Sequence, residues 1–136
     1  MIYSARRTAI RAGGDDAEED ALRGQELAHY VVDVLADGQA ADVVLLDLTE
    51  IEAFTDYFVV ATIDNVRQMR ALLDALSKEL ARVAPEVRVQ EEGTVESGWM
   101  LFDIGELVVH LFSLERRVYY NLEGLWSSAR EVVRIQ

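Results

Sequence analysis

The 136-residue sequence predicts one α/β domain, in which a mixed sheet of five strands has helices packed on it. Apolar residues recur at helical spacing in two long segments, 20–38 and 66–83. Short runs rich in branched and aromatic residues, the pattern of strands, lie between and after these segments. Some of these runs are apolar on both faces, so we expect helices on both sides of the sheet.

The first helix is predicted over 20–38, because Leu27, Val31 and Leu35 share one face and Gly38 is placed to end it. The continuous apolar run at 42–48 indicates a buried strand. Residues 49–56 form a connection, and the aromatic and branched residues of 57–62 predict a second strand.

A long amphipathic helix follows. Asn65 is a candidate N-cap with Gln68 as its capping-box partner, and Pro85 stops the apolar stripe that ends at Val83. A third strand is predicted at 86–90. A right-handed crossover through the helix would make this strand parallel to 57–62.

Two further apolar runs, 99–103 and 107–112, flank a short turn that contains Gly105 and predict a β-hairpin. The tail returns to helical spacing, and Gly124 is placed to divide it into two helices. The apolar residues that carry this spacing are Leu114, Val118, Leu122, Leu125, Trp126, Ala129 and Val133.

Composition narrows the possible functions. The sequence has no cysteine, which excludes disulfides and thiolate metal sites, and no apolar run long enough to span a membrane. Its formal charge of −12 favours basic partners and disfavours specific binding to bare nucleic acid.

Residues 1–19 are interpreted as a flexible N-terminal extension and 20–136 as the single domain. The extension has three arginines and no acid before Asp15, and then an acidic run. Such a start fits either a short organelle transit peptide or, as we prefer, a solvated leader.

Motifs for catalysis are missing. Neither GxxxxGK[ST] nor GxGxxG occurs, and no cofactor is expected. A nucleotidyltransferase palm would need paired carboxylates two residues apart on one strand to hold two metal ions. Asp47 could supply the first, but position 49 is threonine, so the topology is expected without the catalytic residues and the protein is not expected to be an enzyme.

Several residues have two interpretations. Trp99 is either core or an interface anchor. Asp103 and His110 are expected to face each other across the hairpin, as a catalytic dyad or, preferably, as a structural hydrogen bond. Asp56 is a turn residue or an exposed docking residue.

The tail offers a candidate contact surface. Its residues Arg117, Tyr120, Glu123 and Trp126 are spaced by three, so on one helix they would form a stripe. This stripe either packs on the sheet, with Arg117 and Glu123 at its rim, or contacts a partner.

The order and spacing of several segments resemble the iojap / ribosomal silencing factor family over about residues 26–126. The segments are TDYFVVAT at 55–62, Glu92-Gly93, GWMLFD at 98–103, VVHLF at 108–112 and RVYYNLEGLW at 117–126. The family usually has glycine and serine where this sequence has Ile63 and Asn65, which leaves the geometry of that loop open.

The resemblance implies a non-catalytic adaptor that binds the large ribosomal subunit through its basic protein number fourteen. It would block the small subunit and repress translation when nutrients fail. It further implies a cytoplasmic protein, a possible homodimer, and Trp99 as an interface residue. The partner-binding candidates are Asp56, Tyr57, Trp99, Asp103, His110, Arg117, Tyr120 and Glu123. A nucleotidyltransferase-like enzyme and a generic dimeric interaction module are the alternatives.

Overall fold

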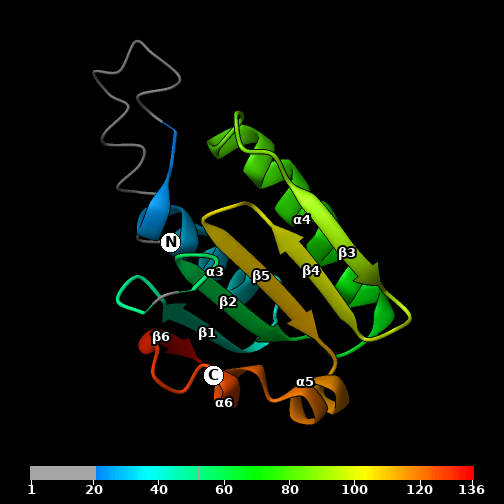
Figure 1. The fold of residues 1–136 in the computed structure, drawn as a ribbon. Coiled ribbons are helices and arrows are strands. Elements are labelled where there is room, and N and C mark those ends of the chain that lie inside the picture. The colour runs from blue at the N-terminus through cyan, green and yellow to red at the C-terminus, as the bar shows by residue number, and fades with distance from the viewer. Residues whose placement is uncertain (1–20, 52) are drawn as a thin grey trace.

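The computed structural model describes residues 21–51 and 53–136, so the predicted extension at 1–19 lies outside the described residues. The strands of this part of the chain form a single twisted sheet, with helices packed against it (Figure 1). In chain order the elements are α3 (Gly24–Asp37), β1 (Ala41–Asp47), β2 (Tyr57–Thr62), α4 (Val66–Val83), β3 (Gln90–Thr94), β4 (Trp99–Asp103), β5 (Leu107–Phe112), α5 (Leu114–Tyr120), α6 (Leu122–Leu125) and β6 (Arg130–Ile135).

The sheet is mixed, as predicted, but has six strands in the order β3-β4-β5-β2-β1-β6. Strands β2 and β5 are parallel neighbours, whereas every other neighbouring pair is antiparallel. The sixth strand, β6, occupies a segment predicted to be helical. Its Val132 and Val133 are half-buried and lie beside β1, so pairing with a long apolar strand prevails over the helical spacing.

The predicted third strand at 86–90 is also wrong, because β3 begins only at Gln90. All five β3 residues are exposed, so no apolar pattern marks this strand, and its pairing with β4 determines where it forms. Strand β3 does run parallel to β2, but β4 and β5 lie between them. The crossover therefore connects strands that are not neighbours.

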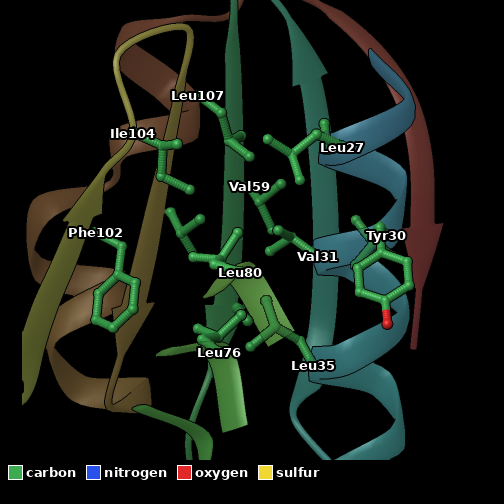
Figure 2. Packing of buried hydrophobic residues seen from close by; sticks show 14 of the residues in the cluster. Leu27, Tyr30, Val31, Leu35, Val59, Leu76, Leu80, Phe102, Ile104 and Leu107 are labelled. Carbon is green, nitrogen blue, oxygen red and sulfur yellow. The ribbon is translucent and has the colours of Figure 1, made fainter. Parts of the chain in front are cut away.

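Helices α3 and α4 cover one face of the sheet and enclose the larger core (Figure 2). Leu27, Val31 and Leu35 of α3 point towards Val59 of β2, as their spacing predicts, and Leu76 of α4 joins them. Burying each such leucine or valine contributes about 1.5–3 kcal/mol. No helix in the described residues 21–51 and 53–136 is long and apolar enough to cross a membrane.

Three of the four ends of these helices agree with the sequence prediction, whereas α3 begins at Gly24, four residues later than predicted. Gly38 ends α3, and the Asn65 side chain accepts a hydrogen bond from the Gln68 N–H at 2.8 Å. The Gln68 side chain accepts a hydrogen bond from the N–H of Asp64. A capping box would instead use the N–H of Asn65, one residue later. Ile63 replaces the glycine usual in the family without opening the loop, since it is buried and its N–H bonds to the Phe112 carbonyl at 2.7 Å.

The second face of the sheet is covered less completely. Phe58 and Phe112 are buried there, and Leu122 and Trp126 from the tail pack over them. Towards β3 and β4 this covering ends, which leaves Trp99 and Leu101 half-buried. This partly open region is the first place to look for a partner.

Candidate functional site

Trp99 is the centre of an aromatic cluster on the second face. Its ring lies 4.5 Å from that of Tyr120, and it stacks on Phe112 at 5.2 Å between centroids. Its indole Nε1 donates a hydrogen bond to Nδ1 of His110 at 3.3 Å. The half-buried indole is thus held from three sides.

The hairpin register produces this cluster. Trp99 pairs with Phe112 and Leu101 pairs with His110, so these four side chains point to the same face. The chain enters β4 through Gly98, which has φ +80° and lies so close to α5 that an added Cβ would be 2.8 Å from Ser113 Oγ. Glycine at this position therefore allows α5 to sit beside the Trp99 ring.

A shallow depression of about 310 Å³ lies against Trp99. We call it the aromatic groove, and it is lined by Glu92, Gly93, Ser97, Trp99, Leu101, Arg116 and Tyr120. The lining is largely apolar and aromatic, and it also includes the carboxylate of Glu92 and the guanidinium of Arg116. Such a combination suits an apolar or aromatic side chain of a protein partner with polar neighbours.

Beside this groove, α5 and α6 expose large apolar side chains. Leu114, Val118, Tyr119 and Leu125 are each between 66 and 75 % exposed, and we call them the apolar ridge. The sequence placed Leu114, Val118 and Leu125 at helical spacing but did not indicate that these side chains are exposed. Several large apolar side chains exposed on one short segment are typical of an interaction site.

His110 has a different neighbour from the one predicted. Asp103 pairs with Val108, and its carboxylate accepts from the Gly105 N–H at 2.8 Å, so the predicted Asp103–His110 contact is wrong. His110 is only 4 % exposed, and burial lowers its pKa to about 4. Its neutral ring accepts at Nδ1 from Trp99, so Nε2 carries the proton, and among the described residues Nε2 has no hydrogen-bond partner. We infer that His110 positions Trp99.

Arg117 lies inside the fold and not at a rim. It is 7 % exposed and forms a two-pronged ion pair with Glu123, at 2.9 and 3.0 Å. Its Nη1 also donates to the Asp42 carbonyl at 2.6 Å and to Thr62 Oγ1 at 2.8 Å. The predicted helical stripe through these residues is wrong, because Asn121 adopts φ 45° and separates α5 from α6.

The remaining candidates lie at the other end of the hairpin. Asp56 is exposed, and its N–H donates to the Glu106 carbonyl at 3.1 Å. Tyr57 is buried in the core under α3 and α4, where burial and the neighbouring carboxylates raise its pKa. Of the eight predicted partner-binding residues, the structure thus brings together Trp99, His110 and Tyr120, and places the other five elsewhere.

Asp47 is bound by its own neighbours. Thr49 occupies the position of a second palm carboxylate, and its N–H and Oγ1 both donate to Asp47 Oδ1, at 2.8 and 2.6 Å. Arg130 of β6 donates to Oδ2 at 2.8 Å. Burial opposes ionisation, but these hydrogen bonds prevail and lower the pKa of Asp47. Within residues 21–51 and 53–136, no three histidine or carboxylate side chains are grouped to hold a metal ion.

Sequence reasoning missed Glu92, Arg116 and the apolar ridge. Glu92 lies on a strand without apolar residues, so nothing marked its position on the sheet. Leu114 and Val118 are four residues apart and share a helix face, but spacing alone does not say whether such a face is turned inward. The neighbouring Arg117 gave no help, because its burial cannot be read from the sequence.

Known proteins match this chain over most of its length. The sequence profile of a family described as "Ribosomal silencing factor during starvation" matches residues 21–136. A ribosomal silencing factor of Halalkalibacterium halodurans is 33 % identical over 82 % of this chain and 94 % of its own. One from Bacillus subtilis is 36 % identical over 68 % of this chain and 78 % of its own.

More distant relatives and solved structures agree. A mouse protein named "Mitochondrial assembly of ribosomal large subunit protein 1" is 31 % identical over 71 % of this chain and 43 % of its own. A crystal structure of a Chromobacterium violaceum protein superposes with a TM-score of 0.70 at 30 % identity, covering 78 % of this chain and 88 % of that one. The chain therefore belongs to the ribosomal silencing factor family, whose name describes a regulatory protein and not an enzyme.

Proposed function

We propose that this protein docks on the large ribosomal subunit through a basic ribosomal protein and sterically blocks association with the small subunit. The basic protein is number fourteen of the large subunit. The observation that supports this most directly is the aromatic groove beside the apolar ridge, on a chain of the silencing-factor family. The mouse relative's name refers to the large ribosomal subunit, which agrees with the choice of subunit.

Charge supports a basic partner. The net charge is −12, and the carboxylate of Glu92 lines the aromatic groove. The exposed carboxylates of Glu96 and Glu115 line a neighbouring depression, which shares Ser97 and Arg116 with the groove. Such a field accelerates encounter with a basic protein and repels phosphate backbones. We therefore place a protein, and not ribosomal RNA, against the groove.

The mechanism needs binding energy alone. A standard protein interface buries about 1,600 Å² in total, or about 800 Å² on each partner, and the groove together with the ridge would form its apolar centre. Trp99 would be the anchor, because its ring is already held by His110 and Tyr120 and loses little freedom on binding. Neither catalysis nor a cofactor is part of this proposal, which places the protein in the cytoplasm, with a possible homodimer off the ribosome.

Sedimentation through sucrose gradients with purified subunits tests the proposal. The protein should migrate with the large subunit and not with the small one, and it should reduce the yield of joined subunits. Binding should weaken as salt rises, because complementary charges are screened. Equal sedimentation with both subunits, or with neither, contradicts the proposal.

The same experiments separate the alternatives. Magnesium-dependent nucleotide transfer that disappears in Asp47→Asn would favour an enzyme. Dimerisation without any ribosome binding would favour a generic interaction module.

Replacing the anchor tests the surface. Trp99→Ala should lower affinity for the large subunit about thirtyfold, since a hot-spot tryptophan contributes about 2 kcal/mol or more. Trp126→Ala is the matched control, because Trp126 packs on Phe58, 5.7 Å between centroids, and should affect stability instead. Equilibrium binding and thermal melting are measured for both. If Trp99→Ala melts far earlier yet binds normally while folded, the assignment of the surface is wrong.

A further inference from the structure

A second groove lies between α3 and α4, on the face of the sheet opposite to the aromatic groove. It has a volume of about 490 Å³ and is open along the two helices. Val34 and Leu72 form apolar parts of its lining, and the small side chains of Ala71 and Ala75 keep it from being filled. We call it the interhelical groove.

The interhelical groove is acidic as well as apolar. Asp33 and Asp37 of α3 line it, as does Glu79 of α4, which is bound by the Tyr30 hydroxyl and by Arg82 at 2.7 Å. The described residues that line it include no lysine or arginine. An occupant should therefore combine apolar side chains with positive charge.

The N-terminal segment of the same chain has this composition. Residues 1–14 contain Arg6, Arg7 and Arg11 with no acid, together with Ile2, Tyr3 and Ile10. The described chain begins next to the groove, because the Leu22 N–H bonds to the Val83 carbonyl at the end of α4. The described chain therefore begins near the end of α4, and the acidic run 15–20 separates this point from the basic residues in the sequence.

The segment is long enough to reach the groove. From Gly24 to Asp33 the rise along α3 is about 14 Å at 1.5 Å per residue. Arg11 precedes Leu22 by 11 positions, a span of about 16 Å if helical and up to roughly 36 Å if extended. Both spans exceed the rise along α3 to Asp33, so the segment is long enough for an arginine to reach the groove.

We propose that residues 2–11 dock in the interhelical groove of their own chain, with the arginines facing Asp33 and Asp37 and with Ile10 against Val34 and Leu72. Covalent attachment gives the segment a high effective concentration at this site, so even weak contacts suffice. The occupied groove lies on the α3–α4 face, so the aromatic groove stays free while the segment is bound.

Paramagnetic broadening in NMR spectra tests the proposal, and the absence of native cysteine allows a single spin label. Ala71→Cys places the label at the exposed border of the interhelical groove, and Ser127→Cys places it in the exposed tail as a control. We expect the Ala71 label to broaden the amide signals of residues 2–11 in the full chain. The Ser127 label should leave them sharp.

Charge variants of the full chain complete the test. The triple variant Arg6→Gln, Arg7→Gln, Arg11→Gln should lose the broadening, whereas the corresponding lysine variant should retain it. In the unlabelled protein, the glutamine variant should also shift the amide signals of Ala71 and Ala75, which excludes interference by the label. The proposal is overturned if those signals do not move and no broadening appears. It is also overturned if broadening arises only between labelled and unlabelled chains, which would indicate a second copy, or only after ribosomal RNA is added.

Discussion

Replacing Arg117 by alanine should destabilise the fold far more than its position in a short surface helix suggests. The substitution removes a guanidinium that is 7 % exposed and leaves the Asp42 carbonyl and the Thr62 hydroxyl without their donor. Glu123 loses its two-pronged partner and keeps the ion pair with Arg134, at 3.5 Å. Breaking a buried pair in this way typically costs about 3–5 kcal/mol. The Glu123 and Asp42 side chains are 26 % and 40 % exposed and regain some hydration, so we expect about 3 kcal/mol.

Urea denaturation measures this loss. A cost of about 3 kcal/mol is a change of roughly a hundredfold in the folding equilibrium. With a slope of about 2 kcal/mol per molar, the midpoint should fall by about 1.5 M with an unchanged slope. Arg117→Lys should lie between the wild type and the alanine variant, because lysine keeps the charge but not the two-pronged geometry.

The neighbouring arginine provides the control. Arg116 lies on the same helix and donates one exposed hydrogen bond, from Nε to the Ser97 carbonyl at 3.2 Å. Arg116→Ala should therefore cost under about 1 kcal/mol. If both alanine variants lose the same stability, the buried network contributes nothing and the reasoning about Arg117 is refuted. If Arg117→Ala binds the large subunit more weakly while fully folded, the residue acts at the interface after all.

Three further predictions concern the core, the hairpin and a helix start. Burial lowers the pKa of His110 from 6.5 in the unfolded chain to about 4 in the folded protein. The contribution of His110 to the free energy of unfolding is therefore complete above pH 6.5, and it declines by roughly 3 kcal/mol as the pH falls towards 4. Urea denaturation between pH 7 and 4.5 should show this decline in the wild type and not in His110→Gln. Gly93→Ala should lower the stability of the fold by at least about 1 kcal/mol more than Gly105→Ala. Both glycines have positive φ, but only at Gly93 would the added Cβ collide with the Trp99 carbonyl, at 2.2 Å. Equal losses in thermal melting would contradict this. Asn65→Ala should cost about 1 kcal/mol in the same assay by removing the α4 N-cap, and an unchanged melting temperature would show that the cap is dispensable.

The elements that the sequence predicted correctly are those whose residues carry their own signal. Helix α4 has an N-cap, an unbroken apolar stripe and a proline shortly after its end, and its bounds agree with the prediction. Strands β2, β4 and β5 agree for the same reason. Strand β3 has only exposed residues, and its position depends on hydrogen bonds to β4, which no local pattern reveals.

The tail shows why spacing can mislead. Its apolar residues fit a helical period, yet Asn121 interrupts the helix and β6 follows. The driving force for β6 is the exposed edge of β1, which is more than 80 residues earlier in the sequence. The site was predicted in part: Trp99, His110 and Tyr120 do cluster, but which neighbours they have depends on the hairpin register.

The pairing of β1 with β6 joins two strands that the ribosome makes at different times. The residues that cover the outer edge of strand β1 are synthesised more than 80 residues after the strand itself. Two ion pairs join β6 to β1, from Arg130 to Asp47 and from Arg134 to Asp42, and a third joins Arg134 to Glu123 of α6. Throughout the synthesis of residues 48–129 the edge of β1 therefore lacks this partner. A chain interrupted before Arg130 keeps a hydrogen-bonding strand available for wrong pairing, so nascent and truncated forms are the ones that need protection from aggregation.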